Sequence, residues 1–399
     1  MRVLVLDTGN EWGGGTNSLI ELLRRIDRSR FDITTCFYHD YGRGRDSSIS
    51  NEMATIGIPF VRLPGRRQPP WAKLAKELAR GLLGWNRRLR AAAVFAIERR
   101  WRIVPRARAI AALLKSGGYD LLYLNNQPSS NLEGYLAGEA AGVPVVQHCR
   151  IDATLNAVEI AATNRVARAV ICVSNGVADS LRGQGIAADR LVVVHNAIDG
   201  KQVLPAPLPL PGVPPGTLVV GTVGQLVKRK SVDDLLRAVA RAGQAFHVVI
   251  VGEGPEAGPL AALAESLGLA GRVHFAGFQQ QPLPWLAAMD VFVLASSKEG
   301  LPRVILEAML LGKPVIAARV VGARELVVEN ETGYLYDHAD IAALAAHLAK
   351  LAAAPALRAE LGARGRQRVL ADFSIERYVA GVEAVLADAV GGTTHGTSA

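Results

Sequence analysis

The feature that most constrains the fold is an alternation of short apolar runs with helical stretches, which occurs twice along the chain. The first series of strand-like runs covers residues 3–6, 33–37, 121–124, 145–147, 170–173 and 191–194. The second series covers residues 219–223, 246–251, 273–275, 291–294, 315–317 and 334–336. Such alternation is typical of parallel sheets covered by helices. We therefore expect an α/β protein with two such domains, and 399 residues are enough for two cores.

A proline-rich segment predicts where the domains meet. Residues 201–216 contain six prolines, which fix the backbone and remove hydrogen-bond donors, so we expect an extended connector. The predicted domains are residues 1–200 and 217–372. A C-terminal helix over residues 373–390 is expected to pack back toward the first domain. The tail, residues 391–399, has too little apolar content to pack and is predicted to be disordered.

Cysteine usage and hydropathy predict a cytoplasmic protein. The three cysteines, Cys36, Cys149 and Cys172, are odd in number and lack the spacing of a zinc site or a disulfide framework, so we expect reduced, packed thiols. The first residues lack the features of a signal peptide. No apolar run approaches the roughly 18 residues of a membrane-spanning helix.

The positive charge is concentrated in one segment. The chain carries a net charge of +9, but residues 66–115 alone hold fourteen Lys or Arg against Glu77 and Glu98, a local balance of +12, so the remainder sums to −3. A local patch of this kind indicates a surface partner more than a general affinity for polyanions. Nucleic acid is not an expected partner, because the segment lacks a recognisable nucleic-acid-binding module.

Within residues 66–110, large apolar side chains accompany these cations. They recur at helical spacing: Trp71, Leu74, Leu78, Leu82 and Trp85. A basic amphipathic segment of this composition can lie on an anionic membrane surface, with its apolar groups in the interface. The alternative is a helical pair that packs on the first domain and presents a solvated basic face.

The most specific motif is the string EGLPRVILEAMLLGKPVIA at residues 299–317, directly after a predicted strand. It places Glu299 in a loop and Glu307 in the helix that follows. Two carboxylates so placed can converge on one polyhydroxylated ligand, since each offers several acceptor sites to hydroxyl groups. An ordinary surface loop with an amphipathic helix is the alternative reading.

This string resembles the family-4 retaining glycosyltransferases of GT-B fold, in which two glutamates are separated by seven residues, as here. The resemblance implies a GT-B fold, with two Rossmann-like domains that face each other across a cleft. It places Glu299, with Gly300 and Leu301, at the sugar of a nucleotide-sugar donor. It places Glu307 on the ribose of the nucleotide.

A second string, VGTVGQLVKRKSVDDLLRAV at residues 220–239, is similar to the family segment that binds the donor diphosphate. The resemblance gives Lys230 the role of neutralising the leaving diphosphate. Gln225 stands where most relatives carry arginine. Either Lys228 or Arg229 compensates, or activity is lower, or the protein is a degenerate relative. A solvated loop lysine is the alternative for Lys230 alone.

The first half carries two weaker signals. In the loop GNEWGGGTNS, Gly14 and Gly15 let the backbone approach a ligand at a helix N-terminus. The spacing fits neither a nicotinamide nor an ATP phosphate loop. The resemblance assigns this loop to the donor diphosphate or to the acceptor, whereas a plain tight turn is the alternative. His148 ends a predicted strand, and the resemblance makes it a catalytic residue that faces the transferred sugar; a satisfied core histidine is the alternative.

Other matching segments are expected to shape the site without chemistry: Asn196 and Asp199 near the hinge, and the turn containing Gly252 and Gly254. The sequence contains no Asp-x-Asp, the pair that transferases of the other common fold use to hold a divalent ion. We therefore expect a nucleotide-sugar co-substrate and neither a cofactor nor a metal.

Together these features predict a retaining glycosyltransferase of hexosyl or N-acetylhexosaminyl type. Its expected partners are a nucleotide-sugar donor and a glycan or lipid-linked acceptor in cell-surface polysaccharide or glycolipid synthesis. Expected catalytic residues are Lys230, Glu299 and His148. A nucleotide-sugar epimerase of the same fold and a non-catalytic sugar-nucleotide-binding relative remain as alternatives.

Overall fold

The computed structural model describes residues 1–391 except 10–11, 43–46, 64–68, 83–84, 211, 215 and 244, so the predicted disordered tail lies almost wholly outside the described residues. The chain forms two compact units. The first comprises Met1–Cys172, Ser180–Val192 and the chain from Gly381 onward, and the second comprises Val173–Asp179 and Val193–Ala380. The units are therefore discontinuous in sequence, whereas the predicted boundary was a single linker.

The first unit contains a seven-stranded sheet of order β3-β2-β1-β4-β5-β6-β7, and the neighbouring strands from β3 to β6 pair in parallel. The strands are β1 (Arg2–Asp7), β2 (Asp32–Phe37), β3 (Phe60–Arg62), β4 (Leu121–Asn125), β5 (Val145–Cys149), β6 (Ala167–Cys172) and β7 (Leu191–Val193). The helices up to this point are α1 (Gly14–Arg25), α2 (Ile49–Thr55), α3 (Pro70–Leu82), α4 (Arg87–Glu98), α5 (Val104–Gly117), α6 (Leu132–Ala141), α7 (Ala157–Val166) and α8 (Asn175–Gly183).

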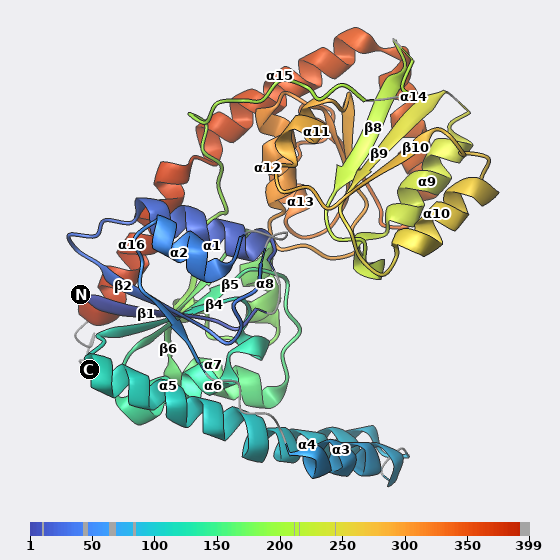
Figure 1. Ribbon diagram of the computed structural model, residues 1–399. Coiled ribbons are helices and arrows are strands. Elements are labelled where there is room, and N and C mark those ends of the chain that lie inside the picture. Colours follow the sequence, from blue (N-terminus) through green and yellow to red (C-terminus); the bar gives the residue numbers. More distant parts are fainter. Residues whose placement is uncertain are drawn as a thin grey trace. The chain divides into compact units, whose positions relative to one another are not determined.

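The sheet of the first unit is covered on both faces. Helices α1 and α2 lie on one face, and α5, α6 and α7 lie on the other (Figure 1). Strands β4 and β5 are buried along their whole length, as expected for a parallel sheet that is covered on both faces. Residues from Gly381 onward also belong to this unit, where the Glu383 carboxylate accepts a hydrogen bond of 2.8 Å from the backbone N–H of Asp27.

The second unit contains a parallel six-stranded sheet of order β10-β9-β8-β11-β12-β13. Its strands are β8 (Leu218–Val223), β9 (Phe246–Val251), β10 (Val273–Gly277), β11 (Val291–Leu294), β12 (Val315–Ala318) and β13 (Gly333–Tyr336). The helices are α9 (Val232–Arg241), α10 (Ala257–Ser266), α11 (Leu283–Ala287), α12 (Arg303–Leu310), α13 (Ala323–Leu326), α14 (Ile341–Ala353) and α15 (Pro355–Asp372). Helix α16 (Ile375–Gly391) begins in this unit, and its part from Gly381 onward belongs to the first unit. Helices α9, α10 and α14 cover one face, and α11, α12 and α13 cover the other (Figure 1).

Both units have the doubly wound α/β architecture, so the predicted fold class is confirmed. All twelve predicted strands are present. The strand order reverses between β1 and β4 in the first sheet and between β8 and β11 in the second. Open α/β sheets bind ligands outside the carboxyl ends of the strands at such reversals. The three cysteines are buried and free, as predicted.

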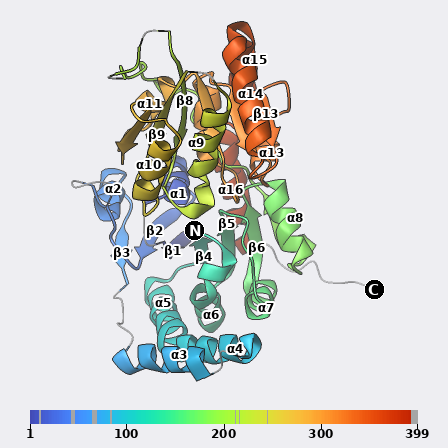
Figure 2. The ribbon, with the colours of Figure 1, turned by 90° about the vertical axis from the view of Figure 1, so that its right-hand side faces the viewer.

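The basic segment forms a helical pair, α3 and α4, which together with the turn that follows α4 we call the arm. Helices α3 and α4 pack against each other, and a π-helical turn (Arg99–Ile103) joins them to α5. In Figure 2, α3 and α4 lie beside the ends of α5 and α6. The prediction of one apolar face from Trp71 to Trp85 was wrong in part, because α3 ends at Leu82 and Trp85 lies in the turn that follows.

Candidate active site

A partly buried ion pair lies at the strand-order reversal of the second sheet. The single turn of 3₁₀ helix after β8 carries Lys230, and the loop after β11 carries Glu299. The Lys230 ammonium donates to Glu299 Oε1 over 2.6 Å, and the Arg229 guanidinium lies 3.3 Å from the same oxygen. The two loops are also joined by their backbones, since the N–H of Ser297 donates to the carbonyl of Arg229 over 2.8 Å. The sequence predicted both residues, and the structure brings them together.

The Glu299 carboxylate is ionised despite its burial. Its residue is 9% exposed, and burial alone would raise its pKa. The positive charges of Lys230 and then Arg229 outweigh burial and hold the pKa of Glu299 below its usual value. The pair therefore presents an ammonium group and an anionic carboxylate together at the edge of the sheet, where ammonium can stabilise a departing anion.

Glycines shape the backbone around this pair. A Cβ on Gly252 would lie 1.9 Å from the carbonyl oxygen of Gly224, and one on Gly254 would lie 2.3 Å from that of Leu226. Both glycines also have positive φ, which other residues rarely adopt. The predicted backbone role of these two glycines is confirmed. Gln225 lies in the loop after β8, between Gly224 and Lys230, and lines a small pocket with Lys230.

The backbone after Glu299 is held by two polar side chains. Ser174 Oγ donates to the carbonyl of Gly300 over 3.0 Å, and Asn196 Nδ2 donates to that of Leu301 over 2.9 Å. Gly300 and Leu301 are buried. Asn196 therefore shapes the loop as predicted, and Ser174 does so as well.

Glu307 lies in the second turn of α12, the helix that follows Glu299. Its carboxylate lies 3.7 Å from the guanidinium of Arg303, four residues earlier on the same helix, and its side chain is 16% exposed. The helix therefore fixes Glu307 in a partly buried, charge-balanced place. Its contact with a ribose stays a prediction.

His148 belongs to a buried polar network in the first unit. Its Nδ1 lies 2.5 Å from the Tyr123 hydroxyl, which in turn accepts from the Arg150 guanidinium over 3.4 Å. Arg150 also donates to Asn125 Oδ1 over 2.9 Å, and Asn125 Nδ2 donates to Asp7 Oδ2 over 2.6 Å. Burial, reinforced by the charge of Arg150, lowers the pKa of His148 well below its usual value, so its imidazole is neutral near pH 7.

The glycine-rich loop adjoins this network. Gly14 and Gly15 begin α1. A Cβ on Gly15 would lie 3.6 Å from the Arg150 side chain, whereas one on Gly14 would have nothing within 4 Å. The loop is thus open at Gly14 and closed against Arg150 at Gly15. Donor binding by these glycines stays a prediction, and residues 10–11 of the loop lie outside the described residues.

Sequence reasoning missed most of the network around His148. Asp7, Asn125 and Arg150 each lie at or directly after the carboxyl end of a strand, on β1, β4 and β5 respectively. Neighbouring parallel strands end at the same edge of a sheet, so these side chains could have been grouped from the strand predictions alone.

The described residues contain neither a cluster of metal ligands nor a single membrane-spanning helix. Among these residues, no group of three or more His, Cys, Asp or Glu is placed to hold a metal ion. Across the same part of the chain, no single helix is long and apolar enough to cross a bilayer. Helices α14 and α15 meet that criterion only as a pair, which is bent by 106°.

The chain has two α/β units, and one of them carries a lysine–glutamate pair at its strand-order reversal. Both features are those that the resemblance to GT-B glycosyltransferases predicts. The family models agree: residues 12–202 match "Glycosyltransferase Family 4" and residues 211–368 match "Glycosyl transferases group 1". Together the two models span most of residues 12–368, so the chain matches these glycosyltransferase families over most of its length.

The curated relatives resemble parts of the chain. The lipopolysaccharide core biosynthesis glycosyltransferase LpsE of Rhizobium meliloti is 34% identical over 209 residues, which are 52% of this chain and 60% of LpsE. The N-acetyl-alpha-D-glucosaminyl L-malate synthase of Bacillus anthracis is 33% identical over 163 residues, 40% of this chain and 43% of the synthase. The matches therefore span about 60% or less of these relatives' own lengths.

A solved structure supports the fold over the whole chain. HepE of Anabaena, in complex with UDP-glucose, is 22% identical with a TM-score of 0.76, and the match covers 97% of this chain and 100% of that one. At this identity the likeness shows the GT-B fold.

Proposed function

We propose that the protein is a retaining glycosyltransferase that moves a hexosyl or N-acetylhexosaminyl group from a nucleotide sugar to a glycan or lipid-linked acceptor. The process it serves is the synthesis of cell-surface polysaccharide or glycolipid. The observation that carries the proposal is the Lys230–Glu299 pair, with its 2.6 Å contact, at the strand-order reversal of the second sheet. The similarity to LpsE, a glycosyltransferase of lipopolysaccharide core biosynthesis, supports it.

The proposed reaction uses the pair directly. As the bond between the sugar and the diphosphate breaks, negative charge grows on the leaving oxygen, and the Lys230 ammonium stabilises it. The leaving oxygen takes the proton of the acceptor hydroxyl, and the acceptor oxygen bonds to the anomeric carbon on the same face. Glu299 positions Lys230 and accepts hydrogen bonds from sugar hydroxyls. No metal ion takes part in this scheme.

Gln225 supports the non-catalytic alternative. It stands in the diphosphate loop beside Lys230 and lines the same small pocket, but an amide brings no charge to a diphosphate. Arg229, which could compensate, already contacts Glu299 Oε1 and donates to the carbonyl of Lys298 over 2.8 Å. A protein that only binds sugar nucleotides would keep the same fold.

The test has two stages. Thermal shifts are measured with UDP-, GDP-, ADP- and dTDP-sugars, because a ligand that binds the native state raises apparent stability. The donor that stabilises the protein is then incubated with and without glycan and glycolipid acceptors. Transfer to an acceptor with retained anomeric configuration supports the proposal. An epimerised sugar nucleotide without acceptor indicates the epimerase, and binding without turnover indicates the non-catalytic relative.

We also propose that the arm holds the enzyme on an anionic membrane surface. The arm exposes large apolar side chains, including Leu74, Leu78 and Leu82 on α3 and Trp85 beyond it, with exposed fractions of 54–79%. Lys73, Arg99 and Arg100 are exposed on the same arm. Apolar side chains beside cations are the composition that binds an anionic interface.

A further inference from the structure

The first unit contains a cavity of about 800 Å³ that none of the roles above uses. Part of its lining comes from segments that directly follow strands: Thr8 follows β1, Ser129 and Ser130 follow β4, and Asn156 follows β5. Strands β1 and β4 are the neighbours at which the strand order reverses. The cavity therefore lies where open α/β sheets bind ligands.

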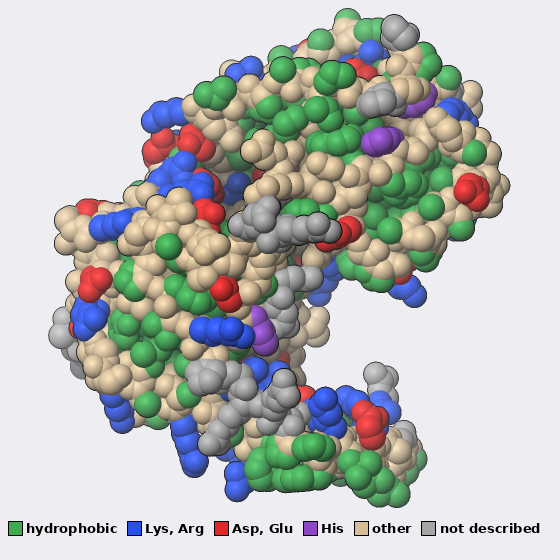
Figure 3. Space-filling model, in the orientation of Figure 1, with side chains coloured by type: hydrophobic (Ala, Val, Ile, Leu, Met, Phe, Trp, Pro, Cys, Tyr) green, Lys and Arg blue, Asp and Glu red, His purple; other side chains and the backbone are tan. Residues whose placement is uncertain are grey.

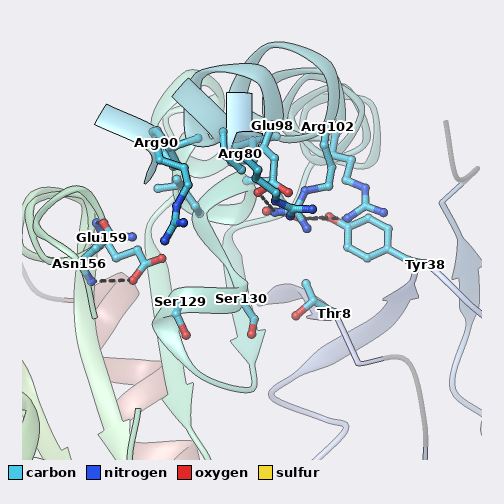
Figure 4. A pocket seen from close by; sticks show the side chains of 16 residues that line it. Thr8, Tyr38, Arg80, Arg90, Glu98, Arg102, Ser129, Ser130, Asn156 and Glu159 are labelled. Carbon is cyan, nitrogen blue, oxygen red and sulfur yellow. Dashed lines mark hydrogen bonds and ion pairs between the residues drawn. The ribbon is translucent and has the colours of Figure 1, made fainter. Parts of the chain in front are cut away.

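The opposite wall of the cavity consists of arginines from the arm and from α5, the helix that follows the arm. Four successive elements supply one each: Arg80 from α3, Arg90 from α4, Arg102 from the π-helical turn and Arg106 from α5. Figure 4 shows the side chains of Arg80, Arg90 and Arg102 directed from the helices toward the loop of Ser129 and Ser130.

Carboxylates hold two of these guanidinium groups in place: Glu133 holds Arg106, and Glu98 holds Arg102. Arg106 lies 3.4 Å from Glu133 Oε1 and 4.1 Å from the ring centroid of Tyr38, whose hydroxyl donates to the same oxygen over 3.0 Å. Glu133 is only 4% exposed. Arg102 lies 3.3 Å from Glu98. These contacts fix the wall of the cavity before a ligand arrives.

The other two arginines leave charge for a ligand. Arg80 pairs with Glu77, which is on its own helix and does not line the cavity. Within the described part of the chain, Arg90 makes no ion pair. Its side chain points toward the part of the cavity that Asn156 and Glu159 line (Figure 4). The cavity thus offers guanidinium groups together with carboxylate, amide and hydroxyl groups.

We propose that this cavity binds the phosphate-bearing sugar of the acceptor, with Arg80 and Arg90 on the phosphate. A phosphate carries up to two negative charges and three acceptor oxygens, which several guanidinium groups can match by paired hydrogen bonds. Glu159, Asn156 and the serines then bind sugar hydroxyls. The inference rests on the proposed function, because it names the class of acceptor.

The faces of the arm favour a lipid as the carrier of that phosphate. On α3, Arg80 is two residues from both Leu78 and Leu82, which places it about 200° around the helix from each. The arm therefore presents cations toward the cavity and apolar side chains on its other side, as Figure 3 shows. A phosphate at a membrane surface would then meet the arginines while the apolar side contacts lipid.

The first experiment measures binding to the full chain by calorimetry, with N-acetylglucosamine 1-phosphate, N-acetylglucosamine and inorganic phosphate as probes. The sugar phosphate should bind at least about tenfold more tightly than either other probe. Arg90→Gln should weaken that binding by at least about tenfold, as expected for a lost charge-assisted bond. Arg108→Gln is the matched control, because Arg108 is exposed on α5 and does not line the cavity.

Several results would overturn the inference. If the sugar phosphate and the neutral sugar bind equally tightly, the cavity does not recognise phosphate. If inorganic phosphate binds as tightly as the sugar phosphate, the cavity does not recognise the sugar. Equal losses in Arg90→Gln and Arg108→Gln show that only net charge matters. A loss in Lys230→Ala as large as in Arg90→Gln places the probe in the second unit.

A second experiment distinguishes a lipid-linked phosphate from a soluble sugar phosphate. Phosphatidylcholine vesicles carrying polyprenyl-phosphate-linked glucose are compared with soluble glucose 1-phosphate. Leu78→Ser with Leu82→Ser should weaken binding to the vesicles alone if the carrier is a lipid. Equal loss with both probes overturns the lipid assignment.

The failure of this inference and that of the proposed function are distinguishable. If the protein binds and turns over a nucleotide sugar but shows no Arg90-dependent binding of sugar phosphate, the proposed function stands and the acceptor-site inference is wrong. If it binds sugar phosphate through Arg90 but has no affinity for nucleotide sugars, the proposed function is wrong.

Discussion

The two units carry their polar sites in different ways. In the second unit the Lys230–Glu299 pair is built from two loops that directly follow adjacent strands, β8 and β11, so the sheet itself positions it. In the first unit the cavity over β1 and β4 is completed by the arm, which is an insertion between β3 and α5. A site placed by the sheet can be recognised from a motif, whereas a site completed by an insertion has to be found in the structure.

The same contrast suggests a division of work. The second unit has a compact ion pair suited to the donor and its departing charge. The first unit has a large cavity in which arginines lie opposite strand-end side chains. We expect variants of the second unit to change turnover with every acceptor, and variants of the first to change which acceptor is used.

The largest effect is expected for Lys230→Ala. Because the ammonium stabilises charge that develops as the donor bond breaks, kcat should fall on the order of 10²–10³-fold, with a smaller change in donor affinity. Steady-state kinetics with two different acceptors measures this, and the loss should be the same for both. A variant that raises only KM would make Lys230 a binding group and remove its catalytic role.

Glu307→Gln should have a smaller effect that lies in binding. A lost charge-assisted bond to the ribose should weaken donor and free nucleotide alike, by about 1–3 kcal/mol. Calorimetry with the nucleotide alone is the measurement. Glu331→Gln, which removes the same charge at an exposed position of the second unit, is a suitable comparison for a general change of charge. Unchanged nucleotide affinity in Glu307→Gln would rule out the ribose assignment.

The sequence predicted most of the fold because buried parallel strands are short apolar runs. It missed β3, which has only three residues, none of them fully buried. It also missed α15, whose apolar pattern is weak: the helix buries only Leu361, Gly362, Gly365 and Val369. Both elements depend on tertiary contacts more than on a local pattern.

The candidate site was predictable only in part, for a related reason. The motifs named Lys230 and Glu299 and placed each after a strand, but they lie 69 residues apart. The direct contact between them follows from the pairing of β8 with β11, which strand predictions do not fix. The cavity arginines carried no motif at all, and the sequence placed them only on a basic amphipathic segment.

Variants of the arm should change membrane binding and leave donor binding intact. Leu78→Ser with Leu82→Ser removes exposed apolar surface and should weaken sedimentation with anionic vesicles several-fold at every salt concentration. Lys73→Gln with Arg99→Gln should weaken it mainly in dilute buffer, because each cation contributes about 1 kcal/mol at most and salt screens it.

Val203→Ser is the matched control for the apolar change, since Val203 is 94% exposed and lies outside the arm. It should sediment like the wild-type protein. If the wild-type protein itself does not bind anionic vesicles in dilute buffer, the arm is a packed surface element. The membrane assignment would then be withdrawn, and the acceptor site would have to be tested with soluble sugar phosphates alone.

The smallest effect is expected from removing divalent metal ions. The sequence lacks an Asp-x-Asp pair to hold an ion on the diphosphate, and the proposed scheme assigns the departing charge to Lys230. Saturating EDTA should therefore leave transfer essentially unchanged. Lys230→Ala should be assayed in the same way. If a metal ion also stabilised the diphosphate charge, the variant would lose less activity in the presence of Mg²⁺ than in EDTA. Activity that disappears with EDTA and returns with Mg²⁺ or Mn²⁺ would show that the ammonium does not carry the diphosphate charge by itself.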